Sequence, residues 1–283
     1  MSLIDLKYLR TWVGTARIDE DLISRRHACL MAAAINYSAA DKISDGEILP
    51  PLWHWIYFLV GVPARELGYD GHPARGGFMP PVPLSNRMWA GGRVSFVTPV
   101  RIGSMVRKES SILTVDHKQG RSGDLVFVTV HHELKSLQGE TLIREEQDIV
   151  YKNSTASGKN DALSTIVPVA HCTTSYTPDS TLLFRYSALT FNGHRIHYDV
   201  DYCREQEGYQ NLVIHGPLNA TMLAGYAQDL CGAELRDFSY RGLSPALLGD
   251  TITLHATIQD KRITLFALLA NGTVCMQAEA LVA

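Results

Sequence analysis

The feature that most constrains the fold is a plan that occurs twice along the chain. A Pro-x-x-x-Gly motif in "VTPVRIGSMV" precedes a long apolar segment, and a second one in "LSPALLGDTI" precedes a similar segment. The second motif, at Pro245, lies 146 positions after the first, at Pro99, and the two glycines have the same offset. A shared plan at a fixed offset is typical of duplication, so the sequence predicts two similar units in tandem.

Strand signals end each half of the chain. The first half contains "RVSFVTPV", "GDLVFVTVHHEL" and "ETLIREEQDIVY", with a turn at Gln138-Gly139 between the last two. The second half contains "TITLHATI", "RITLFALLA" and "TVCMQAEALVA", with an Asn271-Gly272 turn in the same place. Alternating apolar residues around short Gly-containing turns predict antiparallel hairpins in both halves.

Helical signals precede these strands. Apolar residues recur at helical spacing over residues 19–35 and 216–231, where Pro217 suits a first turn, and a short helix is predicted over 52–61. Residues 63–92 are rich in Pro and Gly, which indicates a long loop of the kind that often carries function. We therefore predict an α+β protein with a tandem hotdog plan, each unit a long helix packed on an antiparallel sheet. The expected division is 1–152, a polar linker over 153–180, and 181–283.

Composition excludes several classes of protein. The formal net charge of -3 offers no basic field for nucleic acid or anionic membranes. Five scattered cysteines form no C-x-x-C pair, which argues against a thiolate zinc site or a disulfide framework. The apolar run at 53–62 is shorter than the roughly 20 residues of a membrane span, and the N-terminus lacks a signal-peptide pattern. We expect a cytoplasmic protein without membrane or nucleic-acid partners.

Polar residues with chemical potential concentrate in residues 184–199, "FRYSALTFNGHRIHYD", after a short run that resembles a strand. A metal hypothesis would use His194, His197 and Asp199, with His215 as a further ligand. The dependable zinc patterns, with His at i and i+4 on a helix or Cys paired with His, do not occur here. We therefore expect no metal.

An acid/base hypothesis uses the same stretch differently. His197 supplies an imidazole that can exchange a proton near neutral pH, and Asn192 supplies an amide that can orient a water. The helix that starts at Gly216 has unpaired N–H groups in its first turn, including that of Leu218, which can stabilise a developing negative charge. Gly216 would also let a thioester carbonyl approach the backbone.

The segments "YSALTFNGHRIHYD" and "GYQNLVIHGPL" resemble the signature of the MaoC-like, R-specific enoyl-CoA hydratases. The resemblance implies that His197 is the family's catalytic histidine and that Asn192 stands at the position of its catalytic aspartate. It places His194 on the family's asparagine, and Asp199 is interpreted as a helix cap beside a supporting His215. Because Asn192 cannot take a proton, the family's Asp/His pair cannot operate here unchanged.

The segments "SNRMWAGGRVSF", "GRSGDLVFVTVHHE" and "REEQDIVYK" are similar to the double-hotdog branch of that family. The branch includes hydroxyacyl-thioester dehydratases and hydratases of itaconyl-CoA and mesaconyl-C4-CoA (3-methylfumaryl-CoA). No second copy of the histidine-rich loop occurs in the first half, so one active site is expected, with the first unit shaping the acyl tunnel.

The resemblance implies hydration of an unsaturated acyl-CoA, foremost a branched C5 dicarboxyl-CoA that yields citramalyl-CoA. Candidates for binding the substrate carboxylate or CoA are Arg87, Arg93 and Arg195, because a guanidinium binds carboxylates at two points. The alternatives are a dehydratase of fatty-acid metabolism, a hotdog thioesterase and a non-catalytic acyl-CoA binder. No cofactor is expected beyond the CoA of the substrate. Hotdog units pair, so the chain is expected either to satisfy this pairing internally or to form a homodimer.

Overall fold

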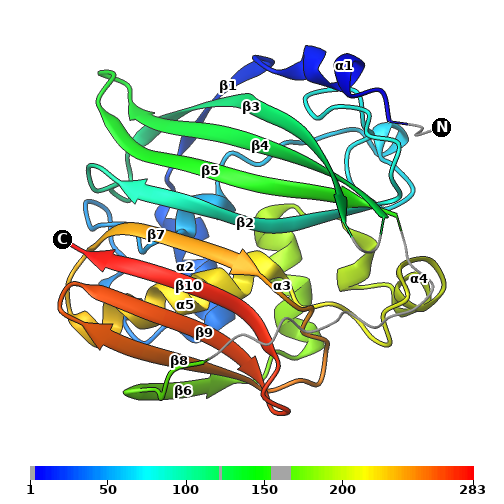
Figure 1. Ribbon diagram of the computed structural model, residues 1–283. Helices are drawn as coiled ribbons and strands as arrows, with labels where there is room; N and C mark the ends of the chain where they lie inside the picture. Colours follow the sequence, from blue (N-terminus) through cyan, green and yellow to red (C-terminus); the bar gives the residue numbers. More distant parts are fainter. Residues whose placement is uncertain (1–3, 121–122, 154–166) are drawn as a thin grey trace.

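The computed structural model describes residues 4–120, 123–153 and 167–283 (Figure 1). The strands of the first half are β1 (Ala16–Leu22), β2 (Asn86–Phe96), β3 (Met105–Gly120), β4 (Gly123–Ser136) and β5 (Thr141–Lys152). Those of the second half are β6 (Cys172–Tyr176), β7 (Leu235–Gly242), β8 (Ile252–Gln259), β9 (Arg262–Leu269) and β10 (Val274–Val282).

All ten strands form one antiparallel sheet. Its order is β1-β3-β4-β5-β2-β7-β10-β9-β8-β6, so each half contributes five strands, and β2 pairs with β7 at the junction. Figure 1 shows the two halves of the sheet one above the other along this junction. The predicted α+β class, the two-unit plan and both predicted hairpins are confirmed.

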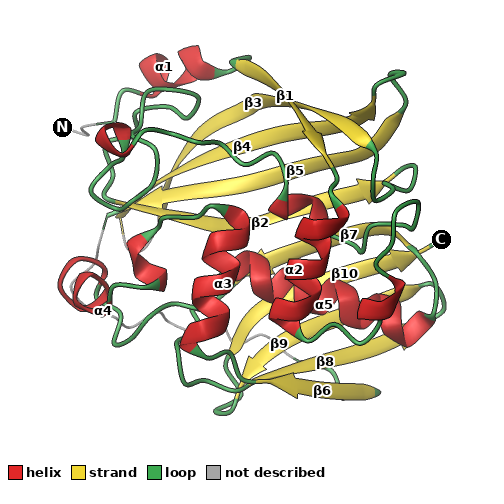
Figure 2. Ribbon diagram, turned by 180° about the vertical axis from the view of Figure 1, so that it is seen from behind, coloured by secondary structure: helices red, strands yellow, loops and turns green. Residues whose placement is uncertain are grey.

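Among the described residues, three helices are long and the other helical elements are short. In chain order, these helical elements are α1 (Leu6–Leu9), η1 (Arg10–Trp12), α2 (Arg25–Ile35), η2 (Ala40–Lys42), η3 (Trp53–Ile56), η4 (Ala64–Glu66), α3 (Ser180–Thr190), η5 (Arg195–His197), α4 (Val200–Tyr202), η6 (Cys203–Glu207) and α5 (Gly216–Cys231). Figure 2 shows α2, α3 and α5 on the same face of the sheet. Among the described residues, no helix combines the length and apolar character needed to cross a membrane.

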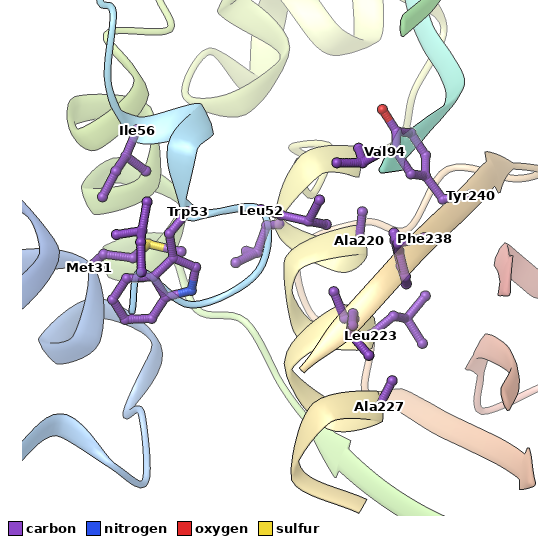
Figure 3. Packing of buried hydrophobic residues seen from close by; sticks show 14 of the residues in the cluster. Met31, Leu52, Trp53, Ile56, Val94, Ala220, Leu223, Ala227, Phe238 and Tyr240 are labelled. Atoms are coloured by element: carbon purple, nitrogen blue, oxygen red, sulfur yellow. The ribbon is translucent and has the colours of Figure 1, made fainter. Parts of the chain in front are cut away.

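Helix α5 forms where the sequence predicts it. Pro217 occupies its first turn, and Gly232 ends it in the left-handed conformation at φ +60°. Figure 3 shows Leu223 and Ala227 of α5 facing Phe238 of β7. All three side chains are buried, and burying a leucine or phenylalanine side chain stabilises the fold by about 1.5–3 kcal/mol. This contact fixes the start of α5, and therefore the site described below, relative to the sheet.

The first half differs from the second in its helix. Residues 19–22 of the predicted helix 19–35 belong to edge strand β1, because exposed and half-buried positions alternate along this strand. The helix then begins after Ser24, whose hydroxyl accepts a hydrogen bond from the backbone N–H of His27. By element order α2 corresponds to α3, and the place of α5 is taken by the short turn η3. The prediction of a long helix on each half of the sheet is thus correct only for α5.

The run before the histidine-rich loop is a helix rather than the predicted strand. Asp179 caps α3 by accepting a hydrogen bond from the N–H of Leu182 at 2.7 Å. Leu183, Tyr186 and Leu189 are buried at spacings of three, the period of a helix face. The helix ends at Phe191, which adopts φ +48° and turns the chain into the loop.

A single large apolar core joins the two halves. It contains Met31, Trp53 and Val94 from the first half together with Leu223 and Phe238 from the second. Part of the predicted linker, 154–166, lies outside the described residues. The described part of the linker contains β6, which extends the sheet of the second half by pairing with β8. The division at 152 and 181 stays a prediction.

Candidate active site

The loop over residues 192–199 starts with a hydrogen-bonded turn at Asn192. The side-chain oxygen of Asn192 accepts a hydrogen bond from the backbone N–H of His194 at 3.0 Å. The backbone N–H of Asn192 donates to Ser187 of α3 at 2.8 Å. Asn192 therefore holds the turn in shape, in the manner of an Asx turn, and its oxygen is already engaged.

His197 is the side chain best prepared to act as a base. Its ring is buried, and Nδ1 lies 2.7 Å from the carbonyl oxygen of Val213. A carbonyl can only accept, so Nδ1 carries the proton and Nε2 keeps its lone pair. Burial lowers the pKa of His197 to about 4, although the bond to Val213 acts in the opposite direction. The imidazole is therefore neutral at pH 7.

His215 supports the ring of His197 from one side. The two imidazoles stack with centroids 3.6 Å apart and an interplanar angle of 17°. His215 is fully buried at the N-cap of α5, and its Nε2 lies 2.8 Å from the hydroxyl of Ser187. Burial lowers the pKa of His215 well below its ordinary range, so the stack joins two neutral rings. The stack fixes His197 beside the start of α5.

Gly216 opens α5 under an aromatic ring from the first half. A Cβ atom at this position would lie 3.0 Å from Cε3 of Trp89, which is closer than ordinary van der Waals contact. Trp89, on β2, stacks in turn on Tyr240 of β7 with centroids 4.4 Å apart. The packing of Trp89 therefore favours glycine at this position, a reason that the sequence did not show. The N–H groups of Gly216 and Leu218 stay the predicted oxyanion donors.

A second loop, which was not predicted to be part of the site, packs against the 192–199 loop. Residues 67–73, termed here the 67–73 hairpin, are closed by a bridge between Leu67 and Pro73. The backbone oxygen of Asp70 accepts a hydrogen bond from the N–H of Arg195 at 2.9 Å. The signal was present in "YDGHP", where an acid and a histidine flank a glycine within a long Pro- and Gly-rich loop. Only the contact with the 192–199 loop gives these residues a place in the site.

Asp70 and His72 form a hydrogen-bonded pair at the tip of this hairpin. Nδ1 of His72 lies 3.3 Å from Oδ2 of Asp70, and the backbone N–H of His72 donates to Oδ1 at 3.0 Å. Burial acts to raise the pKa of Asp70, but the interactions with His72 outweigh it and hold this pKa far below its usual range. Asp70 is therefore an anion that fixes the orientation of the His72 ring.

His194 connects this pair to His197. Its ring centroid lies 4.2 Å from that of His72 and 5.6 Å from that of His197. Burial, followed by the proximity of the titratable rings of His72 and His197, lowers its pKa to about 2. Asp70, His72 and His194 offer ligand atoms within 4.8 Å of one another, a spacing compatible with a metal ion. The carboxylate also accepts two hydrogen bonds from His72, as an acid/base pair would, and the absence of a metal stays a prediction.

The three candidate arginines occupy different environments. Arg93 pairs with Glu146 and Asp148 and is 52% exposed, so its charge is already matched outside the cluster of histidines. Arg195 pairs with Asp199 at 2.7 Å. Arg87 has no ion pair among the described residues, and its charge contributes to lowering the pKa values of Asp70, His72 and His194. Of the three, only Arg87 acts electrostatically on Asp70, His72 and His194.

Asp199 has the predicted capping role. Its Oδ1 accepts a hydrogen bond from the backbone N–H of Tyr202 at 2.9 Å, which caps α4. Its Oδ2 also accepts bonds from the guanidinium of Arg195.

Gly71→Ala is expected to lower kcat about tenfold, because misplacing a site by a fraction of an ångström impairs catalysis. Gly71 has φ +85°, and a Cβ would lie 2.0 Å from the carbonyl oxygen of Gly193, which would force the two loops apart. Gly76→Ala is the matched control, since Gly76 has φ +98° but its Cβ would meet only Pro81 at 3.8 Å. Steady-state kinetics and thermal melts of both variants check this. Equal kcat losses in the two would show that backbone strain alone is responsible.

The activity is expected to persist well below the ordinary histidine pKa. Because the pKa of His197 is lowered from 6.5 to about 4, its neutral, basic form is retained as the pH falls, until the midpoint near 4. The unfolded chain binds this proton from pH 6.5 downward, so stability conferred by the buried neutral ring also declines on acidification. A pH profile of kcat/KM with circular dichroism at each pH separates the two effects. A midpoint near 6.5 in a folded protein would contradict the buried, neutral assignment.

Comparison with known proteins gives one consistent picture. The chain matches the family hydroxyacyl-thioester dehydratase type 2 over residues 52–248. It is 42% identical over 269 residues to mesaconyl-C(4)-CoA hydratase of Chloroflexus aurantiacus, covering 94% of this chain and 95% of that protein.

A MaoC-like dehydratase from Phytophthora capsici aligns with a TM-score of 0.74 at 13% identity, covering 99% of both chains. A Mycobacterium tuberculosis protein described as having a double hotdog fold aligns at 0.58 and 11% identity, over 95% and 96% of the chains. The predicted tandem hotdog fold is confirmed.

Proposed function

The chain belongs to the hydroxyacyl-thioester dehydratase type 2 family of MaoC-like hotdog enzymes, and from this premise we propose that it hydrates mesaconyl-C4-CoA to citramalyl-CoA. The observation that carries the proposal is the 42% identity to a mesaconyl-C(4)-CoA hydratase across almost the full length of both chains. The chain is therefore a hydro-lyase, and its substrate class is a dicarboxyl enoyl-CoA.

The chemistry of this substrate supports a role for Arg87. In 3-methylfumaryl-CoA the free carboxylate is attached to C3, the same carbon that receives the hydroxyl group. The cation that binds this carboxylate must therefore lie close to the base that activates the water. We propose Arg87 for this role, because its charge lowers the pKa values of His72 and His194. A guanidinium can bind the carboxylate through two parallel hydrogen bonds.

The site can carry out the addition with its own side chains. Nε2 of His197 takes a proton from a water, and the resulting hydroxide forms a bond to C3. The C2–C3 π electrons shift toward the thioester carbonyl, whose developing negative charge is stabilised by the N–H groups at the start of α5. The His197 imidazolium then returns the proton to C2. The elements of one water are added, and the enzyme is regenerated.

This scheme uses acid/base chemistry alone, so we propose that no cofactor is needed beyond the CoA of the substrate. Extensive dialysis against a chelator is the corresponding test, and unchanged turnover is the expected result. Loss of turnover that is restored by added zinc would contradict it. The cytoplasmic location and the choice between internal pairing and a homodimer stay predictions from the sequence.

The deciding experiment follows the ultraviolet absorbance of the conjugated enoyl thioester over a panel of CoA esters. The panel contains mesaconyl-C4-CoA, itaconyl-CoA followed through its citramalyl-CoA product, a straight-chain C4 enoyl-CoA and a longer-chain one. Fastest turnover of mesaconyl-C4-CoA is the expected result. Preference for the longer chain would favour the fatty-acid dehydratase alternative. Release of free thiol would indicate a thioesterase, and binding without a spectral change would indicate a non-catalytic acyl-CoA binder.

A further inference from the structure

Hydration requires a water held in one orientation, and a water has two O–H groups to place. In the 192–199 loop, Nε2 of His197 is an acceptor whose tautomer is fixed by a hydrogen bond from Nδ1 to Val213. The side-chain oxygen of Asn192 already accepts the N–H of His194, which leaves it a single lone pair. His215 lies flat against His197 and points its Nε2 to Ser187. A second acceptor whose tautomer is also fixed by a hydrogen bond lies outside this loop, on His72.

His72 has the properties that such an acceptor requires. Its Nδ1 faces the ionised carboxylate of Asp70, which can only accept, so the proton lies on Nδ1 and the lone pair on Nε2. No other residue in the described part of the chain forms a hydrogen bond with Nε2 of His72. The ring is in contact with His194, at a centroid distance of 4.2 Å. Burial is the main cause of a lowered pKa at His72, which keeps the ring neutral and able to accept.

The hairpin that carries His72 is fixed to the 192–199 loop. The backbone bond from Arg195 to Asp70 and the contact between Gly71 and Gly193 join the two loops directly. Arg195 also donates through Nη1 to the backbone oxygen of Tyr69 at 3.2 Å. These contacts hold the ring of His72 beside that of His194, whose centroid lies 5.6 Å from that of His197.

We propose that His72, oriented by Asp70, is a catalytic residue that holds the reacting water from the side opposite His197. The inference rests on the proposed function and assigns to the first half of the chain a direct part in catalysis. One O–H of the water donates to Nε2 of His197, which takes that proton. The other O–H donates to Nε2 of His72 and stays on the oxygen, becoming the hydroxyl hydrogen of the product. No further reactant is needed, since the proton on His197 is returned to C2.

The test is His72→Ala, which removes the acceptor. We expect kcat for mesaconyl-C4-CoA to fall about 10²-fold, with KM little changed, since the water and not the substrate loses its partner. Added imidazole is expected to restore part of the activity, because a free imidazole fits the space left by the ring. Asp70→Asn is expected to give a smaller fall in kcat, since the ring remains but its tautomer is no longer fixed.

A double variant tests the role more sharply. Asn192→Asp would keep an oxygen to accept the N–H of His194 and would add a second carboxylate oxygen beside the water. In the His72→Ala background it is expected to recover activity, because it restores an acceptor from the other loop. The matched control is His117→Ala, which breaks another Asp–His pair, with Asp124 at 2.7 Å, on the β3–β4 hairpin. The control is expected to leave kcat unchanged.

Two results would overturn the inference alone: a His72→Ala enzyme with wild-type kcat, or one whose lost activity neither imidazole nor Asn192→Asp restores. If His72→Ala does not fold, the nearly isosteric variant Asp70→Asn is measured in its place. An unchanged kcat in Asp70→Asn would reject the catalytic role of His72. A wild-type protein that hydrates no member of the panel would instead overturn the proposed function, and this inference with it.

Discussion

His197→Ala is expected to lower kcat for hydration by about 10²- to 10⁴-fold, the range for removal of a positioned acid/base group. The physical reason is the state of the ring. Val213 fixes the proton on Nδ1, the stack on His215 fixes the plane, and burial keeps the imidazole neutral. Alanine removes the lone pair that accepts the proton of the water. Steady-state kinetics with mesaconyl-C4-CoA measures the effect.

The fall in kcat can be assigned to the missing imidazole only if the His197→Ala variant remains folded. Removing the ring leaves a space beside His215, so the thermal midpoint is expected to fall modestly. His197→Gln serves as the second variant, since it fills more of the space while lacking an imidazole. A variant that melts like the wild type and retains near-normal turnover would show that His197 is not the base, and the scheme would have to be abandoned.

Arg87→Met is expected to lower kcat/KM for mesaconyl-C4-CoA by roughly 10²- to 10³-fold, the order found when one member of a close charge pair is removed. Methionine keeps much of the apolar stem, so the main loss is the guanidinium that would face the C3 carboxylate. A monocarboxyl enoyl-CoA, which has no such group, is expected to be affected far less. The ratio of the two values of kcat/KM is therefore the quantity to measure.

The control for this prediction is Arg93→Met. Arg93 lies on the same strand, β2, but is half exposed and paired with Glu146 and Asp148, so its removal is expected to leave the substrate ratio unchanged. An equal loss for both substrates in Arg87→Met would indicate a role in stability or in binding CoA. A loss confined to Arg93→Met would show that the carboxylate is bound elsewhere.

The sequence by itself determined the repeated plan, the two hairpins and helix α5. These depend on local properties, such as the alternation of apolar residues, the Asn271-Gly272 turn and Pro217 in a first turn. The predictions of secondary structure failed where two local signals in the sequence conflict. Residues 16–22 carry acidic residues that resemble a helix start, yet they pair with β3. The run before Phe191 resembles a strand, yet the cap at Asp179 and burial on one face make it helix α3.

The candidate site shows the same division between features that the sequence predicts and features that only the tertiary structure decides. The sequence brought His194, His197 and Asp199 together, because they are neighbours in one loop. It could not predict the ion pairs of Arg93, because Glu146 and Asp148 lie more than 50 positions away in the chain. Nor could it bring Asp70 and His72 to that loop, more than 120 positions away. The packing of Gly71 against Gly193 and the hydrogen bonds from Arg195 do so. Local patterns specify elements, whereas the meeting of two distant loops depends on the folded core beneath them, and that was decided by the tertiary structure alone.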